Sequence, residues 1–336
     1  MKKNYEYFVQ LAIEKFGDEK ISRAKQMIEG AKRITLLSHE GADSDALCSC
    51  AALSSFLVRE DKLVETVLPD KPKIKPFFKS KNLLIGSHSQ IPDILISLDV
   101  ADSARMYNSE QFNGIPLINI DHHQKNSVDC EIKLVDESSA SACEVLCWLM
   151  LSIKNDSIDK FAADALLCGI LDDSIIFRSQ LSNAETLRTA AFLIDIGAGF
   201  MKAKNAVLTY KPPFVVRFWG MLLRRAKAIQ SQSLWVTHVS LKDFSDFGTD
   251  DSILGGFINF CAGIVNFDTV LLLTEKEQGR RVKGSFRSKK CDVALVAEEF
   301  GGGGHKNAAG FEFEGSLRET ENAIVDKFKK LDKEKR

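Results

Sequence analysis

A short apolar run, residues 115–120, ends in Asp121, His122 and His123, three consecutive side chains that can bind a metal ion. Short apolar runs bounded by polar residues predict buried strands. In open sheets of parallel strands flanked by helices, reactive groups lie just past the carboxyl ends of the strands. We therefore expect these three side chains in a crevice at a strand end, although a polar turn after a strand is the simpler interpretation of one such segment.

Three other apolar segments end in the same way. Residues 34–37 lead to His39, Asp43 and Asp45, residues 94–98 lead to Asp99, and residues 165–171 lead to Asp172 and Asp173. Acidic groups crowded into one crevice repel one another and need cations to stay ionised. Mixed imidazole and carboxylate ligands suit Mn²⁺, Fe²⁺ or Zn²⁺, and the carboxylate share favours Mn²⁺. The predicted metal site consists of His39, Asp43, Asp45, Asp99, His122 and Asp173.

These segments resemble the motifs of the DHH phosphoesterase family: His-x-x-x-Asp-x-Asp, a lone Asp after a strand, Asp-His-His, and Gly-Ile-x-x-Asp. Residues 301–310, Gly-Gly-Gly-Gly-His-Lys-Asn-Ala-Ala-Gly, resemble the signature of the DHH-associated C-terminal domain. The motifs follow the family's order over most of the chain. In length and layout the chain is similar to bacterial nanoRNases and 3′-phosphoadenosine-5′-phosphate (pAp) phosphatases. Two positions depart from the pattern, because relatives usually carry proline in place of Ala42 and threonine in place of Asp172.

The segment order and the resemblance together predict an α/β fold with two lobes. The N-terminal lobe has a mainly parallel sheet flanked by helices, and the smaller C-terminal α/β lobe has a mixed sheet. We expect a catalytic domain over residues 1–205, a helical connector over 206–232 and a substrate-binding domain over 233–336. Asp45 is expected to cap the helix that begins at residue 46, in addition to binding metal.

The resemblance also implies a role for each candidate residue in hydrolysis of a phosphate ester by two metal ions. One ion is held by His39, Asp43 and Asp99, and the other by Asp45, Asp99, His122 and Asp173, so that Asp99 bridges them. The ions are expected to be Mn²⁺, with Mg²⁺, Fe²⁺ or Co²⁺ as alternatives, and Asp172 is left open as a substitute for Asp173. Asp121 orients one of the two histidines, and His123 contacts the phosphate. Substrate contacts are expected from Arg287, Gly302, Gly303, Gly304 and His305.

Composition limits the substrate. The 336 residues have a formal net charge of −1, so no global field attracts a long nucleic acid. Short RNA, a dinucleotide such as pApA, or a small nucleotide such as pAp fits this charge better than a long duplex. A cyclic di-AMP or linear dinucleotide phosphodiesterase and a RecJ-like single-strand exonuclease remain the alternatives, and a homodimer is left open. A nucleotide sensor without metal is disfavoured because no ligand residue is missing.

The rest of the chain predicts an ordinary soluble protein. No stretch is long and apolar enough to span a bilayer, and residues 1–20 contain no apolar secretion signal, so we expect a cytoplasmic protein. The eight cysteines lack zinc spacing, and the pairs Cys48/Cys50 and Cys143/Cys147, which lie in apolar helical patterns, are expected as buried free thiols. Residues 71–81 are expected in an exposed basic loop. Arg105 is expected to pair either with phosphate or, equally, with an acidic side chain at the surface.

Overall fold

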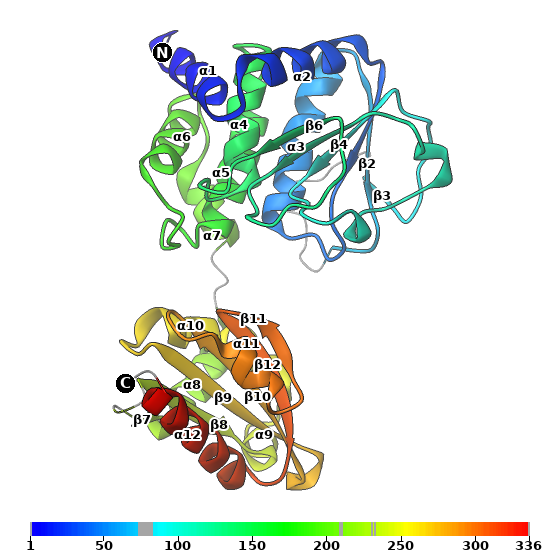
Figure 1. The fold of residues 1–336 in the computed structure, drawn as a ribbon. Helices are drawn as coiled ribbons and strands as arrows, with labels where there is room; N and C mark the ends of the chain where they lie inside the picture. The colour runs from blue at the N-terminus through cyan, green and yellow to red at the C-terminus, as the bar shows by residue number, and fades with distance from the viewer. Residues whose placement is uncertain (1, 73–82, 208–210, 230, 232, 335–336) are drawn as a thin grey trace. The chain divides into compact units, whose positions relative to one another are not determined.

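The computed structural model describes residues 2–72, 83–207, 211–229, 231 and 233–334. The chain divides into two compact units, Met1–Thr209 and Tyr210–Arg336 (Figure 1). Each unit has its own sheet and its own buried apolar cluster. The predicted α/β architecture with two lobes is confirmed. Residues 73–81 of the predicted basic loop lie outside the described residues.

Unit 1 is built on a parallel sheet of six strands, in the order β3-β2-β1-β4-β5-β6. The strands are β1 (Arg33–Leu37), β2 (Leu63–Leu68), β3 (Leu83–Ile85), β4 (Ile94–Leu98), β5 (Leu117–Asp121) and β6 (Ile132–Val135). Central strands β1, β4 and β5 are almost wholly buried, as expected for parallel strands covered on both faces. The strand order reverses between β1 and β4, and crevices for ligands form at such a switch point.

Helices cover the sheet of unit 1: α1 (Lys2–Phe16), α2 (Asp18–Gly30), α3 (Ser44–Arg59), α4 (Ala142–Ile153), α5 (Lys160–Asp173), α6 (Ala184–Asp195) and α7 (Phe200–Val207). Helices α3, α4 and α5 pack closely together, because small residues line their contact. Gly169 on α5 shows how close the approach is. A Cβ atom there would lie 2.3 Å from Cys143 Sγ and 2.8 Å from Asp45 Oδ1, so only glycine fits between α4 and the start of α3.

Unit 2 has a mixed sheet of six strands in the order β11-β12-β10-β9-β8-β7, in which only the β8–β9 pair is parallel. The strands are β7 (Lys227–Ile229), β8 (Leu234–Val239), β9 (Thr269–Lys276), β10 (Arg281–Ser288), β11 (Gly303–His305) and β12 (Ala308–Glu314). The helices are α8 (Pro213–Arg225), α9 (Leu241–Phe247), α10 (Phe257–Ile264), α11 (Val293–Glu298) and α12 (Leu317–Glu334). Two apolar clusters lie on the sheet, one beneath α11 and α12 and the other beneath α8, α9 and α10.

The structure differs from the predicted separate connector over residues 206–232. Helix α8 belongs to unit 2, because its apolar stripe of Val215, Phe218, Trp219 and Leu222 is buried in the cluster against β8 and α10. The Trp219 indole also donates to the Ile253 carbonyl, at 2.9 Å. After α8 the chain forms β7, which pairs with β8. The stripe follows helical spacing and needs a partner to bury it, so this segment packs as part of a domain.

Two further expectations concern the whole chain. None of the described helices has the length and apolar character needed to cross a membrane. Cys48, Cys50, Cys143 and Cys147 are buried free thiols, as predicted.

Candidate metal centre

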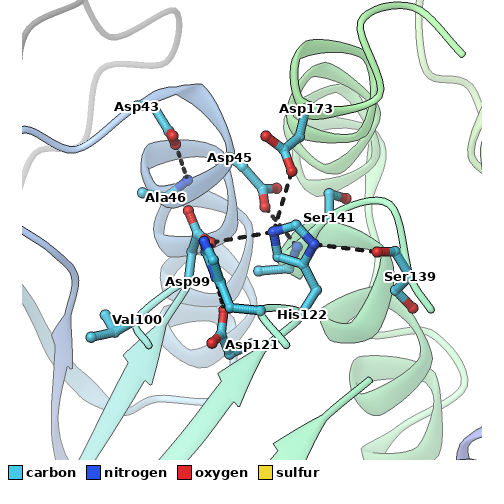
Figure 2. Close-up of polar contacts among 12 residues, drawn as sticks. Asp43, Asp45, Ala46, Asp99, Val100, Asp121, His122, Ser139, Ser141 and Asp173 are labelled. Carbon is cyan, nitrogen blue, oxygen red and sulfur yellow. Dashed lines mark hydrogen bonds and ion pairs between the residues drawn. The ribbon is translucent and has the colours of Figure 1, made fainter. Parts of the chain in front are cut away.

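The carboxyl ends of β1, β4 and β5 and the end of α5 meet at the switch point of the unit 1 sheet. The loop after β1 carries His39, and Asp43 and Asp45 stand at the start of α3. Asp99 follows β4 directly, and β5 ends at Asp121, with His122 next to it. Asp173 is the last residue of α5. In Figure 2 the side chains of Asp45, Asp99, His122 and Asp173 point toward one another from separate elements.

The structure brings all six predicted ligands together. The donor atoms of His39, Asp43 and Asp99 lie within 4.8 Å of one another, and so do those of Asp45, His122 and Asp173. These two groups follow the predicted division between two ions, except that Asp99 falls only in the first of them. A third group with the same spacing joins Asp99 and His122 to Asp121 and His123.

Asp99 lies between the groups and is the most constrained of these residues. Its Oδ2 is 3.5 Å from His39 Nε2, and its Oδ1 is 3.7 Å from His122 Nε2. The residue is only 4% exposed, and its Oδ1 has no hydrogen-bond partner among the described residues. Its φ of 59° is in the left-handed region that residues other than glycine rarely adopt. Burial, reinforced by the neighbouring Asp45, raises the pKa of Asp99 well above its usual range.

A buried carboxylate oxygen without a donor is costly unless a cation compensates it. The orphaned Asp99 oxygen, surrounded by further carboxylates and by imidazole nitrogens, therefore fits a site for divalent metal ions. Carboxylate and imidazole donors without thiolate suit Mn²⁺ or Fe²⁺ better than ions that prefer sulfur ligands.

Asp45 is held by the start of α4. Its Oδ2 accepts from the Ala142 N–H at 2.6 Å, and its Oδ1 accepts from the Cys143 N–H at 3.0 Å. Burial raises the pKa of Asp45 to about 7, although the contacts with Cys143 oppose this. The expectation that Asp45 caps α3 is wrong, because Asp43 is the cap and accepts from the Ala46 N–H at 3.1 Å. Asp45 is already inside the first turn, so its carboxylate is free to reach α4.

Backbone carbonyls fix the tautomers of two histidines. His122 Nδ1 lies 3.2 Å from the Ser139 carbonyl oxygen, and His39 Nδ1 lies 2.9 Å from the Glu40 carbonyl oxygen. A nitrogen that donates to a carbonyl carries the proton, so the Nε2 lone pair is left for a metal. His122 Nε2 faces Asp173, whose Oδ2 is 3.2 Å away.

Asp121 orients His123 rather than His122. Its Oδ1 is 2.7 Å from His123 Nδ1, and its Oδ2 accepts from Asn126 Nδ2 at 2.6 Å. The hydrogen bond to Asp121 raises the pKa of His123. Burial pushes the pKa of Asp121 upward, but the contacts with His123 and Asn126 bring it below its ordinary value. Asp121 is fully buried, whereas the His123 side chain is 46% exposed, so a ligand from solvent can reach the ring.

The structure distinguishes between the two acids at the end of α5. Asp173 lies in the metal group, and burial raises its pKa to about 7. Asp172 is outside the three groups of described residues and hydrogen-bonds to Ser44 instead. The geometry thus favours Asp173 as the ligand.

On unit 2, Arg287 lies on β10 with a neutral neighbour. Its Nε donates to Asn259 Oδ1 on α10 at 2.7 Å, and its Nη1 donates to the Phe286 carbonyl at 2.8 Å. No carboxylate among the described residues forms an ion pair with it, and partial burial lowers its pKa. Its charge is therefore available to an anion. His305 ends β11 and is exposed.

The glycines at positions 302–304 differ in whether packing requires a residue without a Cβ atom. A Cβ on Gly302 would lie 2.1 Å from the Gly310 carbonyl oxygen. Gly304 has a φ of 146°, and its Cβ would lie 2.6 Å from the Ala308 carbonyl oxygen. Both therefore have a packing reason. Gly303 has no positive φ, and a Cβ there would meet no described atom within 4 Å, so the open space beside it is compatible with a close ligand.

Sequence reasoning missed three residues that support these groups. Ser139 acts through its carbonyl, which any residue type supplies, so its identity gave no signal. Asn126 and Asn259 hold Asp121 and Arg287. Isolated asparagines in the sequence are ordinary turn and surface residues, and only their partners reveal their roles.

Comparison with known proteins agrees with this geometry. Residues 33–170 match the DHH family, N-terminal domain, and residues 232–334 match the DHHA1 domain. Together the matches cover more than two thirds of the chain, and the first contains every clustered ligand except Asp173. The chain belongs to the DHH family. The predicted resemblance is confirmed.

Relatives match along most of the chain. The chain is 27% identical over 302 residues to a protein of Thermus thermophilus named bifunctional oligoribonuclease and PAP phosphatase NrnA, covering 88% of each. It is 25% identical over 284 residues to the Bacillus subtilis protein of that name, covering 82% of this chain and 88% of the relative. A crystal structure of an exopolyphosphatase-related protein from Bacteroides fragilis superimposes with a TM-score of 0.77 at 25% identity, covering 94% of this chain and 98% of that one.

This DHH-family chain is therefore a metal-dependent hydrolase of phosphate esters. The cluster at the switch point supplies the ligands such an enzyme needs.

Proposed function

We propose that the enzyme hydrolyses short RNA oligonucleotides to 5′-mononucleotides and also converts pAp to AMP. The observation that carries this proposal is the cluster of candidate ligands around the orphaned Asp99 carboxylate, which lies 3.5 Å from His39 in one group and 3.7 Å from His122 in the other. Relatives named as oligoribonuclease and PAP phosphatase support the substrate class.

The proposed division of labour follows the two units. In unit 1, His39, Asp43 and Asp99 would hold one ion, and Asp45, Asp99, His122 and Asp173 would hold the other. Two such ions, which we propose to be Mn²⁺, neutralise phosphate charge and make water nucleophilic at neutral pH. Unit 2 would bind the nucleotide, with Arg287 donating to a phosphate and Gly303 leaving room for it.

His123 has a chemical role that its contacts define. Asp121 holds Nδ1 and stabilises the protonated ring, so the opposite nitrogen also carries an N–H. That N–H would donate to a phosphate oxygen and stabilise the charge that develops during cleavage. The fully buried Asp121 keeps the ring in the orientation this requires.

Charge favours a short substrate. The chain has a net charge of −1. Residues 280–290, on β10 and just after it, are rich in lysine and arginine, but some of these cations are already paired. Arg281 lies 3.6 Å from Glu312, and Lys290 lies 3.1 Å from Asp268. Few cations remain to follow a long strand, so affinity should depend only weakly on salt.

The test compares 5′-phosphorylated RNAs of about two, five and twenty-four nucleotides with pAp, pApA and cyclic di-AMP, each with Mn²⁺ at low and moderate salt. We expect the highest kcat/KM for the shortest RNAs, together with hydrolysis of pAp. The Asp99→Asn protein, purified in parallel, controls for contaminating nucleases. Equal use of the longest RNA would favour a RecJ-like exonuclease, and exclusive cleavage of cyclic di-AMP would favour a signalling phosphodiesterase.

A further inference from the structure

Arg105 lies beside the metal centre, and no acidic partner for it is found among the described residues. It ends the short 3₁₀ helix Ser103–Arg105 in the loop after Asp99. This loop lies against the loop after β1 that carries His39. The Glu40 N–H donates to the Arg105 carbonyl at 2.8 Å, and Met106 forms a β-bridge with His39. One imidazole ring therefore separates the Arg105 guanidinium from the carboxylates.

The guanidinium uses few of its donors on the protein. Arg105 Nη2 lies 3.1 Å from His39 Nδ1 and 3.2 Å from the Glu40 carbonyl oxygen. When His39 Nε2 faces a metal, Nδ1 carries the proton and donates to that carbonyl, so it cannot also accept from Arg105. Of these two contacts, only the one to the Glu40 carbonyl then remains a hydrogen bond. The side chain is exposed, so most of its five N–H groups remain available.

Charge balance at the site calls for such a group. The metal ligands include four carboxylates, those of Asp43, Asp45, Asp99 and Asp173. Their four negative charges equal the positive charge of two divalent ions, and Asp121 is already paired with His123, 2.7 Å away. A substrate phosphate adds negative charge that the ions and their ligands leave unbalanced. Guanidinium matches phosphate geometrically, because it offers parallel N–H donors.

We propose that Arg105 binds the phosphate group that is cleaved, donating to its non-bridging oxygens beside the first metal position. This rests on the proposed use of the site for phosphate esters, and it adds a second phosphate-binding arginine, on unit 1, to Arg287 on unit 2. The competing explanation is structural: the Arg105 side chain holds the Glu40 carbonyl, and thereby His39, in place for metal.

The two explanations predict opposite changes in metal affinity. A phosphate-binding cation near the centre repels divalent ions in the free enzyme, so Arg105→Gln should bind Mn²⁺ more tightly, by about twofold or more. A residue that only positions His39 would instead weaken Mn²⁺ binding when it is removed. Titration of the metal-free protein with Mn²⁺, followed by calorimetry or electron paramagnetic resonance, measures this sign without any turnover.

The matching measurement is the affinity of the Mn²⁺-loaded protein for inorganic phosphate, which contains a single phosphate group. We expect Arg105→Gln to weaken it by about tenfold or more and Arg105→Lys to weaken it less, because lysine keeps the charge but loses the paired donors. Arg23→Gln is the control for net charge, since Arg23 is an exposed residue of α2 that pairs with Glu131. Unchanged phosphate affinity, or weaker Mn²⁺ binding, in Arg105→Gln would overturn the proposal.

Phosphate binding also separates this proposal from the proposed function. If the wild-type enzyme cleaves neither short RNA nor pAp, the proposed substrates are wrong, yet the phosphate and Mn²⁺ titrations still decide the role of Arg105. If it cleaves them, Arg105→Gln should lower kcat/KM for both by a similar factor of about ten or more, because the cleaved phosphate is common to them.

Discussion

The two units differ in the charged groups at their candidate sites for an anionic substrate. Unit 1 brings several buried carboxylates together. Among them, Asp99 has an oxygen without a hydrogen-bond partner among the described residues and a left-handed backbone conformation. Unit 2 uses open space beside Gly303 and a guanidinium, Arg287, whose side-chain partner is a neutral amide. The carboxylates of unit 1 need cations to balance their charge, whereas Arg287 in unit 2 needs no bound ion. This difference supports the proposed division, in which unit 1 performs the chemistry and unit 2 binds the substrate. Unit 1 contains a cluster that a bound ion would stabilise, and the described residues of unit 2 contain none.

Replacing Asp99, the proposed shared ligand, should have the largest effect on activity of all the substitutions considered. Asparagine has the shape of aspartate and tolerates a positive φ, so Asp99→Asn should fold where alanine would be strained. We expect kcat to fall by roughly 10³-fold or more. In chelator the same substitution should stabilise the protein by about 1–3 kcal/mol, because it removes a buried group that must otherwise take up a proton.

Steady-state kinetics with Mn²⁺ and thermal unfolding in chelator test the two halves of this prediction. Turnover by Asp99→Asn within about tenfold of the wild-type rate would end the interpretation of Asp99 as a shared ligand. If Asp99→Asn melts at a lower temperature than the wild type in chelator, the carboxylate stabilises the fold instead of straining it.

The second prediction concerns recognition on unit 2. Arg287→Ala should raise KM for nucleotides by about 10- to 100-fold, with little change in kcat, because the lost hydrogen bonds are common to the ground and transition states. Arg281→Ala on the same strand is the matched control, since Arg281 is paired with Glu277. A fall in kcat at constant KM would place Arg287 in the chemistry and contradict the division between the units.

The two units also differ in how far the sequence predicted them. The clustering of the candidate ligands in unit 1 was predictable, because parallel strands end at one edge of a sheet and His39, Asp99 and His122 follow three such strands. The cap of α3 was not, because Asp43 and Asp45 are chemically equivalent and only the backbone shows which one precedes the helix. The Ser139 carbonyl that sets the His122 tautomer was likewise invisible, because a main-chain contact leaves no residue signature.

In unit 2 the mixed sheet was expected, but the assignment of α8 was not. An apolar stripe predicts that a helix packs, but it does not say against which domain, and the partner β8 comes later in the chain. The glycine-rich segment was predicted as a single substrate-binding group. Contacts divide it, because Gly302 and Gly304 are required by β12, whereas Gly303 is not.

That division gives the third prediction. The free energy of unfolding of Gly303→Ala should lie within about 1 kcal/mol of the wild-type value, because the new Cβ meets no described protein atom. The KM for nucleotides should rise severalfold, because the Cβ narrows the proposed ligand space. Gly302→Ala should lose about 1–3 kcal/mol of stability, because its Cβ would overlap the Gly310 carbonyl. Thermal unfolding and nucleotide KM of both variants test this, and equal KM for Gly303→Ala and wild type would leave Gly303 without a role in binding.

The smallest expected effect concerns charges in unit 2 that have only a structural role. Asp243 receives both Nη atoms of Arg225, at 2.5 and 2.9 Å, and also the Ser240 N–H at 2.7 Å. Burial alone would raise the pKa of Asp243, but the hydrogen bonds from Arg225 and Ser240 lower it to about 2. Because the folded pKa lies below the unfolded value of about 3.9, the stabilisation is complete above that value and is lost as pH falls toward 2.

Asp243→Asn should therefore cost about 2 kcal/mol at pH 6 and roughly half of that at pH 3. The measurement is the free energy of unfolding of both proteins across this range, with kcat at neutral pH as the second readout. We expect kcat to stay at the wild-type value, because Asp243 lies on α9 of unit 2 and belongs to none of the groups that carry chemistry. A stability difference independent of pH would mean that Asp243 acts through shape alone. A loss of kcat would show that the structural charges of unit 2 influence the metal centre, which the separation of chemistry from recognition forbids.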